Sequence, residues 1–159
     1  MQSLVKREVQ VSYNAHIDLI SQMVIDSLEV MRHRERSPID PGNALYHRML
    51  RQTGHSAALR RLLSADWQEQ NKINTFGLFF TQKEADNNTI RDPLSEVLRN
   101  YGVIGRPVSV IGLVQEVDVL IVCDTLHSHE RHKQAWEFIG KNFLEEGASI
   151  NLRLVVFLG

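Results

Sequence analysis

Closely spaced runs of β-branched apolar residues in the second half of the chain constrain the fold more than any other feature. Two runs cover 107–114 and 117–124, and a third covers 150–158. Strands that are apolar along almost their whole length belong to a sheet covered on both faces. Between the second and third runs, 128–146 has the apolar spacing of an amphipathic helix that ends at Gly147. The pattern predicts a β-β-α-β unit at the C-terminus.

The strands before and after this helix have a predictable relation. A connection of about nineteen residues with helical periodicity is typical of a right-handed crossover, which joins parallel strands. We therefore expect the 117–124 strand to be central and the 150–158 strand to lie beside it and parallel to it.

The first long helical pattern predicts a helix over 15–34, with Asn14 as its N-cap. Its apolar positions are more numerous than one buried stripe requires, which favours contact with a partner chain or a second copy. These positions are 17, 19, 20, 23, 24, 25, 28, 30 and 31.

Further elements follow from helix caps and periodicity. Asp40 before Pro41 predicts the start of a second helix that ends near Thr53, and a third helix is expected over 56–71. The aromatic segment 73–81 predicts a strand.

The segment between that strand and the C-terminal unit is more polar. A loop is expected over 85–89, and Asp92 followed by Pro93 predicts a helix that Gly102 ends.

Length and composition favour one domain of 1–159 that folds by itself, since 43% of its residues are hydrophobic and 23% charged. We expect an α+β (or α/β) fold in which a mainly helical part, 1–72, packs on a small mixed sheet formed by 73–159. The net charge of −1 excludes a global attraction to nucleic acid or anionic membrane. No apolar run approaches a membrane span or a signal peptide, and the lone Cys123 fits a reducing compartment, so we expect a cytoplasmic protein.

The strongest candidate for a metal site lies where the 117–124 strand passes into the next helix. Ligand-type residues gather there, and strand carboxyl ends are where α/β folds often place sites. His129 and His132 share a helix face at the i, i+3 spacing, which suits zinc. A catalytic histidine without metal and a solvated helix start are the alternatives. The residues are Cys123, Asp124, His127, His129 and His132.

Glu116 and Asp118 form the second candidate, because strand alternation puts both carboxylates on one side, as in two-metal sites. With the helices and strands of 92–158, this pair resembles the core of minimal nucleotidyltransferases and, more loosely, restriction-endonuclease-like nucleases. The resemblance implies catalysis of phosphoryl transfer with a divalent metal as cofactor. The Gly-Ser turn of the transferases is missing, and Asn151 stands where they commonly place a third carboxylate. A degenerate acidic motif, or a hairpin with a charged turn, is the simpler interpretation.

The third candidate is a basic segment, 31–61, which has seven arginines but only two acidic residues. Guanidinium groups suit phosphate oxygens, so the segment favours a nucleic-acid or charged protein partner, with a solvated helix face as the simpler explanation. The arginines are Arg32, Arg34, Arg36, Arg48, Arg51, Arg60 and Arg61.

Motifs of the common enzyme classes are missing, since the sequence contains no Walker A loop, GxGxxG, GxSxG or HExxH. We therefore expect a non-catalytic binding protein that engages nucleic acid or a protein partner through an arginine-rich helical surface. The alternatives are a metal-dependent nucleotidyl- or phosphoryl-transfer enzyme or nuclease, and a structural homo-oligomer.

Overall fold

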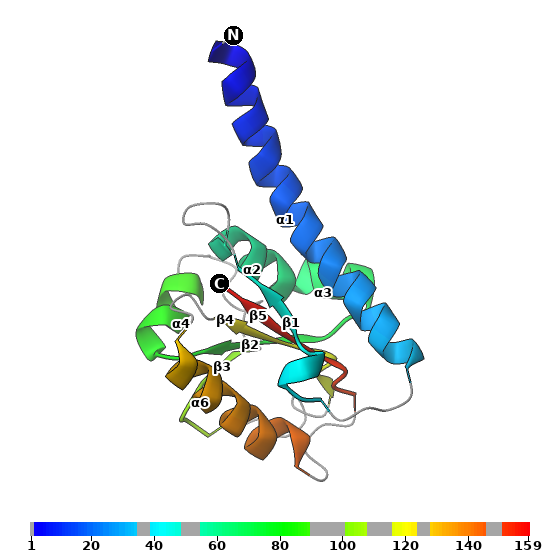
Figure 1. Ribbon diagram of the computed structural model, residues 1–159, viewed down its shortest axis with the longest axis vertical. Helices are drawn as coiled ribbons and strands as arrows, with labels where there is room; N and C mark the ends of the chain where they lie inside the picture. Colours follow the sequence, from blue (N-terminus) through cyan, green and yellow to red (C-terminus); the bar gives the residue numbers. More distant parts are fainter. Residues whose placement is uncertain are drawn as a thin grey trace.

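The computed structural model describes residues 2–34, 39–48, 55–89, 101–107, 116–123, 128–145 and 151–159 (Figure 1). Its helices are α1 (Gln2–His33), a 3₁₀ turn η1 (Pro41–Asn43), α2 (His55–Leu63), α3 (Ala65–Asn71), α4 (Gln82–Thr89), α6 (His129–Ile139) and a π-helical turn η3 (Gly140–Leu144). Its strands are β1 (Leu45–His47), β2 (Thr75–Phe79), β3 (Tyr101–Val103), β4 (Val119–Cys123) and β5 (Leu154–Leu158). No helix among these residues is both long and apolar enough to cross a membrane.

The five strands form one sheet in the order β1-β5-β4-β2-β3, and every neighbouring pair is parallel. The fold is therefore α/β, and the expected mixed sheet is wrong. Parallel neighbours need long crossover connections, which is why described helices lie between β1 and β2, between β2 and β3, and between β4 and β5 in the chain. The predicted relation of β4 and β5 is confirmed, because β4 is central and Val119 to Cys123 pair with Leu154 to Leu158.

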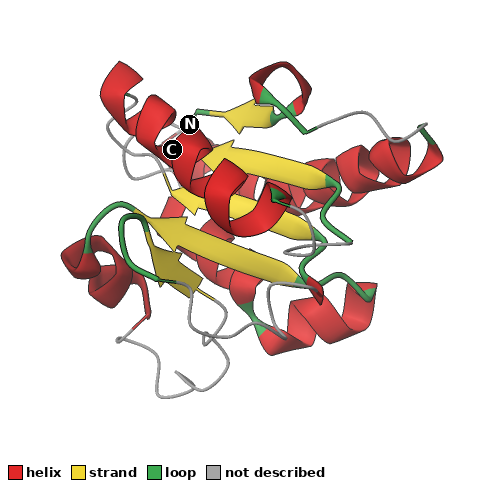
Figure 2. Ribbon diagram, turned by 90° about the horizontal axis from the view of Figure 1, so that it is seen from below, coloured by secondary structure: helices red, strands yellow, loops and turns green. Residues whose placement is uncertain are grey.

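Helices cover both faces of the sheet (Figure 2). Alternate residues of β4 point to opposite sides, so that Ile121 packs with α1, α2 and α3 whereas Leu120 packs with α6 and η3. All five residues of β4 are buried, as the continuous apolar run predicts.

Helix α1 begins at Gln2, so the expected N-cap at Asn14 is wrong. The segment before Asn14 has no proline or glycine to stop a helix, and the N-terminal part of α1 extends beyond the rest of the molecule (Figure 1). The later turns bury Ile17, Ile20, Val24 and Leu28 against the sheet. Leu19 and Val30 remain exposed, and a partner for them stays a prediction.

The second expected helix is replaced by η1 and β1. The Asp40 carboxylate accepts a hydrogen bond from the Gly42 backbone N–H at 2.7 Å, which caps a single 3₁₀ turn. The chain then extends because Leu45 to His47 pair with Val156 to Leu158 at the edge of the sheet. The part of the chain expected to be mainly helical thus contributes an edge strand.

Three other boundaries differ from expectation. The helix expected over 56–71 is two helices, because Ser64 interrupts it and caps α3 by accepting from the Trp67 N–H. The loop expected over 85–89 is part of α4. Gly102 ends no helix but lies in β3, where an added Cβ would meet the Phe76 ring at 3.3 Å.

The remaining elements agree with the sequence or lie outside the described residues. Strand β2 falls within 73–81, and α6 begins after Ser128, whose hydroxyl accepts from the Arg131 N–H at 3.0 Å. The helix expected from Asp92 and the strand expected over 107–114 fall largely on residues that the structure does not describe.

Candidate functional site

A hollow of about 500 Å³ opens at the carboxyl edge of the sheet, where β1 and β5 end and α6 begins. In parallel sheets this edge is the usual place for ligands. Its lining residues are Tyr46, His47, Arg48, Ser128, His129, His132 and Phe157. The hollow therefore joins Arg48 from the predicted basic segment to His129 and His132 from the predicted metal cluster.

Aromatic rings form one wall of this hollow. The Tyr46 ring stacks on the Phe157 ring, with centroids 5.0 Å apart and planes 19° apart. His132 and Trp136 of α6 lie against the same Phe157 ring, at 5.2 and 5.6 Å. Phe157 is buried, but Tyr46 is 48% exposed, so its ring is accessible to another planar group.

The polar atoms of this wall contact one another. Trp136 Nε1 donates to His132 Nε2 at 3.0 Å, which requires a lone pair rather than a proton on that nitrogen. The Tyr46 hydroxyl lies 3.0 Å from the same nitrogen and 3.1 Å from the Pro41 carbonyl oxygen. Burial raises the pKa of Tyr46, so its hydroxyl stays protonated and neutral near neutral pH.

His47 turns to the other face of β1, toward α1. Its Nε2 lies 3.1 Å from His16 Nε2, and both side chains are partly buried. Burial lowers the pKa of His47, and the charge of His16 lowers it further. His47 is therefore unprotonated at neutral pH.

The predicted Cys-His cluster is divided between the two faces of the sheet. Cys123 is buried on the α1 and α2 face, whereas His132 packs on the α6 face and His129 is exposed. Asp124 and His127 lie outside the described residues. In the described part of the chain, no three His, Cys, Asp or Glu side chains are arranged to hold a metal ion.

The predicted acidic pair lies at the opposite, amino end of β4. The Asp118 carboxylate accepts from the Asn74 backbone N–H at 2.8 Å and lies 3.5 Å from the Arg32 guanidinium. Glu116 is exposed, and its backbone carbonyl accepts from the Asn74 side chain at 3.0 Å. Asp118 thus connects the start of β4 to the start of β2 and to the last turn of α1. These contacts give the acidic residue a structural role.

This role predicts a stability effect at Asp118. Replacing Asp118 with alanine should lower the free energy of unfolding by about 1–2 kcal/mol, because a mostly buried carboxylate that accepts a backbone hydrogen bond is lost. Asparagine keeps an acceptor and should cost less. Urea denaturation of both variants measures the difference. Equal stability of wild type and Asp118→Ala would contradict the structural role.

The five predicted arginines that the structure describes do not share one surface. Arg32 is at the amino edge of the sheet with Asp118, and Arg61 of α2 pairs with Asp18 of α1. Arg48 is at the carboxyl edge, on the hollow. Arg60 of α2 is partly buried, and Arg36 and Arg51 lie outside the described residues.

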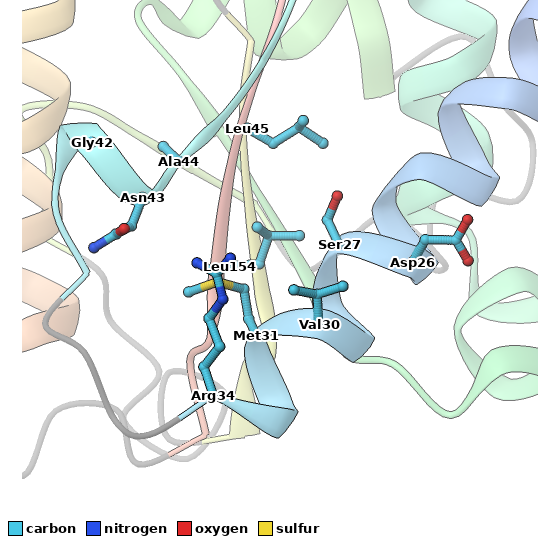
Figure 3. Close-up of a pocket in the computed structure, with 10 residues that line it drawn as sticks. All are labelled: Asp26, Ser27, Val30, Met31, Arg34, Gly42, Asn43, Ala44, Leu45 and Leu154. Atoms are coloured by element: carbon cyan, nitrogen blue, oxygen red, sulfur yellow. The ribbon is translucent and has the colours of Figure 1, made fainter.

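Arg34 belongs to a separate groove of about 350 Å³ between α1 and β1. Figure 3 shows Met31, near the end of α1, and Arg34, just after it, extending toward Leu154 in this groove. The lining is mostly small and apolar, and it has neither the aromatic stack nor the histidines of the hollow.

Sequence reasoning missed Tyr46, His47 and Phe157 as site residues, and it did not single out Trp136. The available signal was the Tyr46-His47-Arg48 triplet directly after Leu45. It was missed because the segment was assigned to a helix, whereas the alternation of a strand puts Tyr46 and Arg48 on one face and His47 on the other.

No family model, no curated protein and no solved structure matches this chain. The fold and the site geometry therefore carry the functional argument for this chain.

Proposed function

We propose that this chain is a non-catalytic binding protein whose carboxyl-edge hollow takes a nucleotide of a single-stranded nucleic acid. The observation that carries the proposal is the exposed Tyr46 ring, stacked on Phe157 with Arg48 on the same hollow. Any of the bases can stack on a tyrosine ring, and a guanidinium binds the adjoining phosphate.

The surroundings of Tyr46 support a single strand over a duplex. The aromatic wall presents ring faces, which only unpaired bases can meet. His129 is exposed at the start of α6, also lines the hollow, and has a ring nitrogen that can donate to a phosphate. The chain is almost neutral, so its net charge does not attract phosphate. Arg48 and His129 have to do so locally.

The proposal predicts distinct effects for the two central residues. Tyr46→Ala should weaken binding of a labelled single strand by about 1–3 kcal/mol, or roughly 5- to 150-fold, because one stacked base is lost. Arg48→Ala should weaken binding of every sequence and reduce the salt slope by about 0.7, the loss of one phosphate contact. Fluorescence anisotropy over a salt series, with EDTA present, measures both effects.

Arg34→Ala is the matched control, because Arg34 is also exposed but lies on the separate groove. Its affinity and salt slope should equal those of the wild type. The proposal is wrong if single strands do not bind at low salt, or if Tyr46→Ala and Arg48→Ala bind as well as Arg34→Ala. Preference for duplex would also contradict it.

A further inference from the structure

His16 of α1 and His47 of β1 face one another where the long helix crosses the edge of the sheet. Their Nε2 atoms are 3.1 Å apart, and the ring centroids are 5.3 Å apart with planes at 66°. Thirty-one positions separate the two residues in the sequence, so only the tertiary structure brings the rings together.

We propose that His16 and His47 form a binding site for a divalent transition-metal ion of the zinc and nickel type, with water in the remaining coordination positions. The site is distinct from the Cys-His cluster suggested by the sequence and does not depend on the proposed nucleic-acid function.

The distance between the nitrogens suits a shared ion. Metal–nitrogen bonds of about 2.0–2.1 Å to two nitrogens 3.1 Å apart give an angle of about 100° at the metal. That angle lies between those of adjacent ligands in octahedral and tetrahedral coordination. Without an ion, one Nε2 donates to the other. Binding requires that both rings carry their proton on Nδ1 and turn so that both Nε2 lone pairs point to the ion.

Both rings are held by elements that packing fixes in place. His16 precedes Ile17, which is 5% exposed, and His47 pairs with Leu158 in the sheet. The His47 carbonyl also accepts from the Gly159 N–H at 3.0 Å. Little conformational entropy is therefore lost when the rings bind an ion, and the ion would cross-link α1 to β1.

The site also has room for solvent ligands and suitable ligand atoms. Both side chains are only partly buried, so water has access to the rings. Two imidazoles suit zinc, nickel and copper better than magnesium or calcium. His132 is a poorer ligand through Nε2, because Trp136 already donates to that nitrogen.

Calorimetric titration of the full chain with Zn²⁺ and with Ni²⁺ at neutral pH tests the proposal. We expect one ion per chain and a raised melting temperature, because only the folded state brings the rings together. His16→Gln and His47→Gln should each weaken binding roughly tenfold or more and abolish the metal-induced rise. Glutamine can still hydrogen-bond, and circular dichroism of each variant without metal checks that it folds.

His33→Gln and His129→Gln are the matched controls. His33 is exposed and lies 2.9 Å from Glu29 one turn earlier on α1. Both controls should bind metal as the wild type does. Unchanged binding in His16→Gln and His47→Gln, or loss of binding in either control, would overturn the assignment, and so would the absence of saturable heat.

A second measurement needs no substitution. Substoichiometric Cu²⁺ should broaden the amide resonances around residues 16 and 47 first. Broadening centred on residue 33, or on 129 to 132, would place the ion elsewhere and overturn the proposal. Binding of single-stranded nucleic acid is measured with EDTA present, which removes metal ions. Failure of the metal site and failure of the nucleic-acid proposal are therefore separate results.

Discussion

Replacing Phe143 with alanine should lower the free energy of unfolding by about 3–5 kcal/mol, the cost of removing a large buried ring. Phe143 lies in the π-helical turn η3 and is 0% exposed. Its ring packs edge-on against Phe76 of β2, with centroids 5.4 Å apart, and against Phe138 of α6 at 6.5 Å. The cavity would lie between the sheet and α6, where two well-packed elements have little freedom to close it.

The neighbouring Leu144→Ala is the control, because Leu144 is in the same turn but 39% exposed. It should change stability by no more than about 0.5 kcal/mol. Equilibrium urea denaturation, followed by circular dichroism, measures both variants. A loss at Leu144 equal to that at Phe143 would mean that η3 does not direct Phe143 into the core.

Leu28→Ala in α1 should cost about 2–5 kcal/mol. Leu28 is 1% exposed and belongs to the cluster that packs α1 against α2 and the sheet, with Leu59 and Val156 among its members. Alanine is a good helix former, so the loss comes from the cavity and the lost burial rather than from weaker helix propensity.

Leu19→Ala provides the same chemical change on the same helix at a position that is 54% exposed. It should alter stability by about 0.5 kcal/mol or less. If the dependence of the free energy of unfolding on denaturant concentration is unchanged in both variants, their stabilities can be compared directly. Equal effects would contradict the packing of α1 on the sheet, whereas a large loss at Leu19 alone would indicate that this outer face is buried in an oligomer.

Local patterns accounted for the elements whose stability depends on near neighbours. The runs at β2, β4 and β5 are apolar enough to be strands in any buried sheet, and Ser128 caps α6 through a contact three residues away. The parallel pairing of β4 with β5 was also predictable, because the connection between them has helical periodicity and crossover length.

The candidate site was predictable only in part. Arg48, His129 and His132 were identified as candidate residues from their type, and all three line the hollow. Their common location was not predictable, because β1 is a strand only where β5, more than a hundred residues later, offers an unpaired edge. A three-residue strand has too little local preference to be recognised without its partner.

By itself, the sequence determined where the buried strands lie, how α6 begins and that β4 and β5 run parallel, because periodicity, caps and chain length act over short distances. Only the tertiary structure decided that the whole sheet is parallel and that Asp118 binds Asn74 and Arg32. It also brought His16 to His47 and Tyr46 to Phe157. These contacts join residues far apart in the chain, and their geometry follows from packing helices on both faces of a sheet, which no local pattern specifies.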